Sequence, residues 1–307
     1  MTSTKLTPAL LMSLAALAVA AVTAQAASPK AKISPTAAKA GTDRKAAMKA
    51  KQSGHTQAPA KADAFTLSRG TNTLRAILVH APPVYDPGGP VCFVEEWQGD
   101  ESLLADAEQT AAERGAVLAR VVCVHADKAR AELLARRGYT IASEWYTAPL
   151  PLADTLHSAH IRRLTAGDVP RVLELGEQKR RQYEAYSPVF WRVSPRPRKT
   201  FAPYMQAQIA DAQNVALAHE RGGRMDGFVL ANARGYIDDF MVAAPELWPT
   251  VGAEMLRAAG AAAYERGAKS LLIVCGHGDK PKQVMLASQG LTLATGWYVR
   301  PLARETR

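Results

Sequence analysis

Two adjacent aspartates, Asp238 and Asp239, interrupt a strongly apolar run at residues 236–242 (YIDDFMV). A carboxylate in a pocket can act as a general base, because burial raises its pKa. Consecutive side chains of a strand face opposite ways, so we expect only one of the two to point into a cleft, and we favour Asp238. The alternative is that both carboxylates serve only to keep a strand edge soluble.

The cysteines and histidines predict neither a disulfide framework nor a metal site. Cys92, Cys123 and Cys275 are odd in number, which leaves no closed set of disulfides. Cys123 and Cys275 lie in apolar runs, and we expect each to be a buried strand residue too far from the other to pair. His125 and His277 follow these runs singly, and nothing has the spacing of metal ligands.

A long internal repeat organises the chain. Residues 113–150 recur at 265–302, 152 positions later and without a gap, with 18 of 38 residues identical. The identities include ERGA, the Cys and His of each copy, an Asp-Lys pair, a Trp-Tyr pair and a Pro-Leu pair. The repeat indicates that one supersecondary unit occurs twice in the chain. Two copies are too few for a solenoid.

The second copy predicts alternating helices and strands. Apolar residues at three- and four-residue steps from 251 to 263 indicate a helix, and Gly267 ends it. A buried strand at 270–275, a helix from Pro281 to about residue 289 and a strand at 291–299 follow. We expect the 270–275 strand to run parallel to its predecessor. The first copy repeats this order with strands at 117–124 and 139–146 around a helix at 128–137.

The two copies differ in what precedes this unit. Strands are expected at 214–220, 225–231 and 236–242 in the second copy, and at 74–80 and 91–94 in the first. Only the second copy adds a short strand at 160–164, a helix that begins near Pro170 and a further helix at 201–211.

This order of elements at 160–302, with the opening IRRLTAGDVPRVLEL and the GYIDDFMV strand, resembles the GNAT superfamily of acyl-CoA N-acyltransferases. Residues 64–150 resemble a GNAT domain that lacks its first strand and both early helices. The resemblance implies an α+β fold with a mixed sheet. It also implies two GNAT-like domains in tandem at 64–150 and 160–302, a linker at 151–159 and a tail at 303–307.

The resemblance implies an acetyl-CoA site at the start of the helix after the 236–242 strand, where backbone amides cradle the pyrophosphate. Thr250 stands at the middle glycine of the family pattern, Leu247 at its leading Arg or Gln, and Pro249 lacks a donor. Trp248 is a bulky neighbour. The residues expected to contact acetyl-CoA are Met241, Val242, Ala243, Thr250, Val251, Gly252 and Ala253.

The resemblance also implies the catalytic groups. Asp238 or Asp239 would be the general base. The tyrosine that returns a proton to the departing thiolate is replaced by Leu286, and Tyr298 and Ser288 are nearby substitutes in the sequence. Tyr186, Phe190 and Trp191 either line the acceptor site or fill the core under a long loop. The first copy carries acidic residues at 95–100, so we expect it to pack against the second copy without binding CoA.

The resemblance therefore predicts an N-acyltransferase that moves an acetyl group from acetyl-CoA to a primary amine by direct attack. The alternative is a GNAT-like protein that has lost catalysis and acts as a binding or interaction module. The amine acceptor would be a small molecule or a peptide, and the sequence does not identify it. No metal is expected, and the oligomeric state is open.

The N-terminus predicts export. Residues 8–23 are apolar, and Ala24-Gln25-Ala26 fits signal cleavage, so residues 1–26 are expected to be a signal peptide and 27–63 a disordered basic linker. The net charge of +10 lies mostly in this linker and only weakly on the remainder, which argues against nucleic-acid binding. We expect an exported protein without stable membrane association, or a cytoplasmic one if translation starts downstream.

Overall fold

The computed structural model describes residues 64–81, 84–152, 158–195 and 197–302. For residues 197–200 it describes the backbone alone. The predicted signal peptide, the linker at 27–63 and the tail at 303–307 lie outside the described residues, as do 153–157 of the predicted 151–159 connection. Within the described ranges, none of the helices has both the length and the apolar character needed to cross a bilayer.

The first repeat, defined as residues 64–150, contains five strands and two helices. The expected elements are present, and a first strand at 64–69 is one that the sequence did not reveal. In order, the elements are β1 (Ala64–Arg69), β2 (Asn72–Val79), β3 (Val91–Gln98), α3 (Glu101–Glu113), β4 (Leu118–Val124), α4 (Lys128–Arg136) and β5 (Thr140–Pro149).

The second repeat, defined as residues 160–302, adds two early helices to the same plan. A capping box between Thr165 and Asp168, followed by Pro170 in the first turn, starts the long helix α5. The elements are β6 (Ile161–Arg163), η3 (Ala166–Asp168), α5 (Val169–Tyr186), α6 (Pro197–Ala210), β7 (Val215–Arg221), β8 (Arg224–Ala231), β9 (Tyr236–Val242), η4 (Pro245–Leu247), η5 (Trp248–Gly252), α7 (Ala253–Glu265), β10 (Ser270–Gly276), α8 (Lys280–Ser288) and β11 (Thr292–Pro301).

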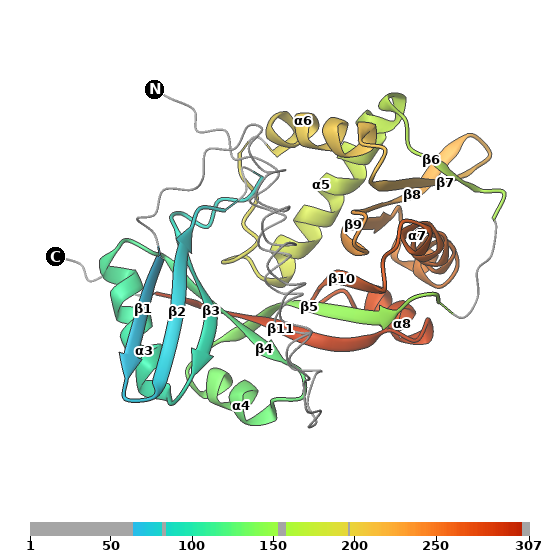
Figure 1. Cartoon of the computed structure of the whole chain (residues 1–307). Helices are drawn as coiled ribbons and strands as arrows, with labels where there is room; N and C mark the ends of the chain where they lie inside the picture. The colour runs from blue at the N-terminus through green and yellow to red at the C-terminus, as the bar shows by residue number, and fades with distance from the viewer. Residues whose placement is uncertain (1–63, 82–83, 153–157, 196, 303–307) are drawn as a thin grey trace, which may run out of the picture. The chain divides into compact units, whose positions relative to one another are not determined.

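All eleven described strands form one mixed sheet, and six α-helices pack on it, so the fold is α+β (Figure 1). The order is β1-β2-β3-β4-β11-β5-β10-β9-β8-β7-β6. β4 runs parallel to β3 and β10 runs parallel to β9. The parallel pairing predicted for the 270–275 strand is therefore confirmed.

The two repeats exchange their last strands. β5, which ends the first repeat, pairs with β10 of the second, and β11, which ends the second, pairs with β4 of the first. The pair Ser270–Pro149 is equivalent to the pair Leu118–Pro301 under the 152-residue offset. The central β5–β11 ladder maps onto itself in the same way, with Glu144 opposite Gly296 at its middle. The repeats are thus related by a local two-fold axis through that pair.

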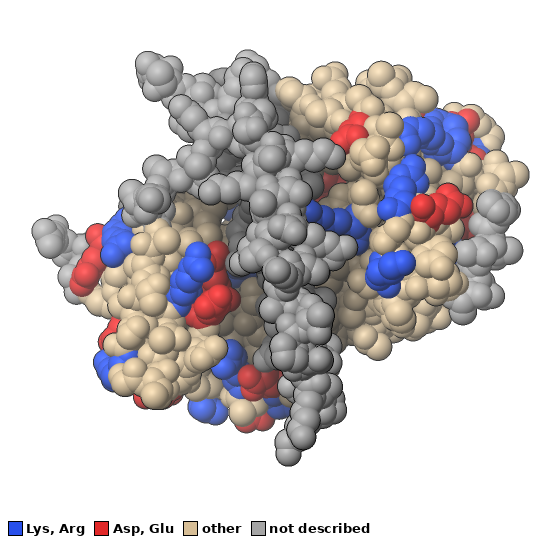
Figure 2. Space-filling view, in the orientation of Figure 1, with Lys and Arg blue, Asp and Glu red and all other residues tan. Residues whose placement is uncertain are grey.

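Different helices pack on the two faces of the sheet. Apolar side chains of α7 and α8 pack with Ile237, Phe240 and Ile273 on one face, whereas α5 and α6 pack with Phe228 and Met241 on the other. We call these the α8 face and the α5 face. On the surface shown in Figure 2, acidic and basic side chains lie close to one another over both repeats.

Candidate functional site

The site predicted beside the aspartates begins where β9 and β10 separate. The two parallel strands pair only at Leu272–Tyr236 and Ile273–Ile237 in the described sheet. Past this point the strands diverge, so main-chain groups of Phe240 and Val274 lose their ladder neighbour across the gap. A wedge between these strands is what the predicted acyl-carrier site requires.

A β-bulge decides where the aspartates point. The β8–β9 register shifts between Leu230–Asp239 and Ala231–Ile237, which leaves Asp238 as an extra residue. Ile237 and Phe240 both lie in the core on the α8 face, so the two aspartates between them both turn to the α5 face. The expectation that only one of them could face a given cleft is wrong, because strict alternation fails at a bulge.

Lys179 of α5 holds the two aspartates in place. Its ammonium donates to the main-chain oxygen of Asp238 and, at 3.2 Å, to Asp239 Oδ1. Lys179 is 5% exposed and Asp239 is 7% exposed, so this ion pair is largely shielded from solvent. Burial raises the pKa of Asp238, and the neighbouring Asp239 raises it further, while Lys179 and Lys282 oppose the shift. Asp238 is therefore a stronger proton acceptor than an exposed aspartate.

Tyrosine rings line the α5 face around this carboxyl group. Burial, together with the neighbouring Asp238, raises the pKa of Tyr236, and burial together with the two aspartates raises the pKa of Tyr85 and Tyr204. These tyrosines stay protonated at neutral pH and offer O–H donors next to a carboxylate. The surroundings are aromatic and weakly polar, which suits the cationic end of an amine.

The loop after α5 closes over this surface. Trp191 packs on Tyr85 at 5.0 Å and on Tyr183 at 5.5 Å, and its indole donates to the main-chain oxygen of Ala142. Phe190 is 8% exposed and lies 6.0 Å from Trp297. The loop aromatics thus belong both to the packing and to the boundary of the α5 face.

On the α8 face, the wedge is filled by Lys282. This side chain is fully buried, and its ammonium donates to Val274 O at 2.9 Å and to Phe240 O at 3.5 Å. These are carbonyl groups of β10 and β9, the two strands that separate here. Burial lowers the pKa of Lys282. The ammonium therefore occupies the position in which an acyl carrier would hydrogen-bond the separated strands.

Trp248 fills the remaining space beside Lys282. Its ring lies 4.9 Å from Phe240 in an edge-to-face contact and 5.4 Å from the Lys282 ammonium. A Cβ atom on Gly252 would lie 2.6 Å from this ring. The glycine expected to let a pyrophosphate approach is instead covered by the chain's own indole.

Backbone amides of the predicted pyrophosphate loop already donate hydrogen bonds to the chain's own carbonyl groups. Helical structure begins at Pro245 and continues through η4 and η5 into α7, so residues 250–253 are not at a free helix N-terminus. The Ala253 amide donates to Trp248 O, and the Ala243 amide donates to Asp226 O. The remaining predicted contacts with acetyl-CoA are placed as follows: Thr250 is exposed, whereas Met241, Val242, Val251 and Gly252 are buried.

Tyr298 does not lie with the aspartates. It packs against the core of the first repeat, whereas Trp297, beside it in β11, contacts Trp145 on the α5 face. Alternation along the strand therefore puts the Tyr298 ring on the opposite face from Asp238. Leu286, at the position of the family's tyrosine, is fully buried in the core.

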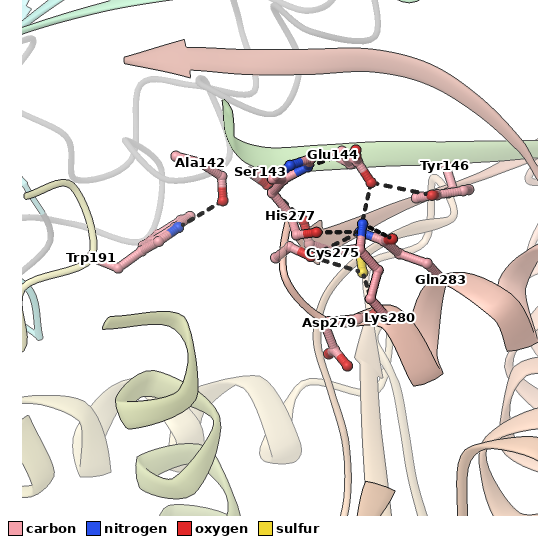
Figure 3. A network of polar contacts seen from close by, with 11 residues as sticks. Ala142, Ser143, Glu144, Tyr146, Trp191, Cys275, His277, Asp279, Lys280 and Gln283 are labelled. Carbon is pink, nitrogen blue, oxygen red and sulfur yellow. Dashed lines mark hydrogen bonds and ion pairs between the residues drawn. The ribbon is translucent and has the colours of Figure 1, made fainter. Parts of the chain in front are cut away.

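A polar network that the sequence did not reveal lies on the α8 face at the local two-fold axis (Figure 3). Glu144 Oε1 lies 2.9 Å from His277 Nδ1, and Glu144 Oε2 accepts from Gln283 Nε2 at 2.7 Å and from Tyr146 at 3.2 Å. Glu144 and Tyr146 come from the first repeat, and His277 and Gln283 from the second. Only the exchange of last strands brings them together, so sequence spacing could not have found this network. It joins the repeats through hydrogen bonds to both carboxylate oxygens of Glu144.

Cys92, Cys123 and Cys275 are free and buried, and the buried strand positions expected for Cys123 and Cys275 are confirmed. In the described part of the chain, no group of three or more His, Cys, Asp or Glu side chains has the arrangement of a metal site.

Neither a scan of known protein families nor a search of curated protein sequences finds a match. Among solved structures, the GCN5-related N-acetyltransferase from Sphaerobacter thermophilus superposes with a TM-score of 0.53 at 13% identity, over 75% of this chain and 76% of that one. The fold is that of the GCN5-related N-acetyltransferases. A tandem GNAT protein from the clavulanic acid biosynthesis pathway gives a TM-score of 0.43 at 14% identity, over 80% of this chain and 85% of its own. A GCN5-related N-acetyltransferase from Kribbella flavida gives a TM-score of 0.49 at 14% identity, over 78% of this chain and 90% of its own.

The two sides of this GNAT-like fold have different chemical capacities. On the α5 face, a carboxyl group with a raised pKa lies among aromatic rings. On the α8 face, the residues do not fit a bound acyl-CoA, because Lys282 and Trp248 fill the wedge and the helix begins before the predicted anion cradle. The α5 face therefore presents a carboxyl group among aromatic rings, whereas the separated strands on the α8 face offer no open position for a CoA donor.

Proposed function

We propose that this chain is a GNAT-fold protein that binds a small amine on the α5 face beside Asp238 and does not use acyl-CoA as a donor. The observation that carries the proposal is the buried ammonium of Lys282 between β9 and β10. A pantetheine arm that bound the main-chain oxygens of Val274 and Phe240 would have to displace the Lys282 ammonium, which is shielded from solvent. Displacing it would leave a buried charge without partners, which costs several kcal/mol.

The α5 face supports the amine half of the proposal. Asp238 and Asp239 supply negative charge, and tyrosine and tryptophan rings surround them. An ammonium ion gains from both groups, through the carboxylate and through the ring faces. Lys179 already neutralises part of the Asp239 charge, so Asp238 is the better partner for an added cation.

Calorimetry and thermal unfolding test this function directly. The probes are CoA, acetyl-CoA and three primary amines: butylamine, phenethylamine and spermidine. At least one amine should raise the unfolding temperature by several degrees, and Asp238→Asn should abolish the shift. Asp106→Asn, a change at a half-exposed aspartate of α3, is the matched control and should leave it unchanged. Stabilisation of the wild-type protein by CoA would contradict the proposal.

A second candidate function is the amine N-acyltransferase expected from the resemblance. The observation that favours it is the placement of Asp238, with its raised pKa, at the point where β9 leaves β10. That arrangement would let a carboxylate take a proton from an amine that attacks a thioester. Incubation with acetyl-CoA and the same amines, with a thiol reagent present, separates the two candidates. Release of CoA above background that requires Asp238 would establish the second candidate and refute the first.

A further inference from the structure

A buried lysine takes the place of a cation beside one of the two aspartates. Lys179 is 5% exposed, and its ammonium lies 3.2 Å from Asp239 Oδ1. The same ammonium donates to the main-chain oxygen of Asp238, but its ion pair is with Asp239. The charge of one carboxylate is therefore met from within the chain, by a side chain of α5.

The two carboxyl groups differ in what can reach them. Asp239 is 7% exposed and its partner Lys179 is equally shielded, so an added cation does not reach this ion pair without breaking it. Asp238 is only half-buried. Arg180, the next residue of α5, stacks on the Phe201 ring at 4.6 Å from its centre. Asp238 is thus the carboxyl group of the pair that a soluble amine can approach.

The remaining charges near Asp238 do not alter this balance. After Asp239, the charges that act most strongly on Asp238 are those of Lys179 and Lys282. Lys282 belongs to the α8 face, where the buried Asp279 opposes its charge. The aspartate pair and Lys179 therefore leave one negative charge without a partner on the α5 face.

We infer that the α5 face selects monoamines over diamines, and that Lys179 is the residue that determines this selection. One added ammonium neutralises Asp238. A second ammonium on a short chain finds Asp239 already paired and approaches the like charge of Lys179, and this repulsion is stronger in a shielded site than in water. The inference rests on the proposed amine-binding function and names the class of amine.

Two matched pairs of amines test the selection by calorimetry. Butylamine is compared with 1,4-diaminobutane, and phenethylamine with its 4-aminomethyl derivative, so that each pair differs by one ammonium group. The wild type should bind at least one monoamine, and should bind it at least about fivefold more tightly than the matching diamine. Lys179→Met should reverse this preference, because the second ammonium then takes the position beside Asp239.

A double variant separates charge from shape. Lys179→Met combined with Asp239→Asn removes one charge of each sign, so it should keep the preference of the wild type for the monoamine. Arg181→Met is the control for loss of a cation from α5, because the Arg181 side chain is 74% exposed. It should bind all four amines like the wild type.

The outcomes separate this inference from the function it rests on. A wild type that binds each diamine as tightly as its monoamine, or more tightly, would overturn the selection and leave amine binding intact. An unchanged preference in Lys179→Met would overturn the assignment to Lys179. Binding of none of the four amines would overturn both the inference and the proposed function. The wild-type comparison and the double variant, which leaves no buried charge unpaired, decide the question even if Lys179→Met fails to fold.

Discussion

Replacing Lys282 measures how firmly the wedge between β9 and β10 is filled. Lys282→Met keeps most of the side-chain volume and removes the ammonium, so Val274 O loses its 2.9 Å donor and Phe240 O its 3.5 Å contact. An acceptor left unpaired costs about 1–3 kcal/mol, and removing a buried charge offsets part of that. We expect the free energy of unfolding to fall by about 1–2 kcal/mol.

Lys282→Ala should cost more than Lys282→Met. The stem of Lys282 packs near the rings of Phe240 and Trp248, and truncating it leaves a cavity. Loss of a large buried side chain typically costs about 2–5 kcal/mol, so we expect a total loss of about 3–5 kcal/mol. Urea unfolding followed by tryptophan fluorescence measures both variants. An alanine variant within about 0.5 kcal/mol of the wild type would refute the view that this side chain belongs to the core.

The pH dependence gives an independent check with a definite sign. Burial lowers the pKa of Lys282 in the folded state below the ordinary value of 10.5, so the unfolded chain binds more protons between the two values. The wild type should therefore gain stability relative to Lys282→Met as the pH rises toward 10.5, and lose that gain as the pH falls through the folded-state pKa. A flat difference over this range would show that the ammonium carries no burial penalty.

Further perturbations test other parts of the fold. Gly235→Ala should cost at least about 2 kcal/mol in urea unfolding, because φ is +84° and the new Cβ would lie 2.2 Å from Ser270 O; the control Gly222→Ala, with φ of +59° and open space, should cost about 1 kcal/mol. Glu108→Ala should cost about 2–3 kcal/mol, because the buried hydroxyl of Tyr139 loses its acceptor and the partly exposed Arg137 and Arg300 lose an ion-pair partner, and a loss below about 1 kcal/mol would contradict this. Burial raises the pKa of Cys92 and Cys275 to about 12 and of Cys123 to about 11; a thiol reagent at pH 8 should therefore label the folded protein far more slowly than the unfolded chain, and rapid labelling of any of the three would show that its thiol is accessible.

The sequence was sufficient for the elements because local patterns encode them. Helical spacing, capping residues and the 152-residue repeat predicted the helices and nearly all of the strands, and they predicted the parallel pairing of β10 with β9. The strand β1 was missed because AFTLSR carries only a weak alternation of apolar and polar residues. The element order alone was enough to suggest the GNAT-like fold.

The sequence also showed the charged groups of β9, but not their geometry. A carboxylate pair in β9 was visible, yet the bulge that turns Asp238 and Asp239 to one face depends on the β8 register. Lys282 was not singled out, because nothing in KPKQV shows that its ammonium reaches the carbonyl groups of two other strands. The structure similarly placed Tyr298 on the opposite face from the aspartates.

What the sequence determined by itself was the set of elements, their order and the identity of the charged side chains, all of which depend on interactions over a few residues. What only the tertiary structure decided was which of those side chains meet. The exchange of β5 and β11 brings Glu144 to His277 and Arg120 to Trp297. These contacts join residues more than a hundred positions apart, and their pairing follows from sheet register and core packing, which no local pattern records.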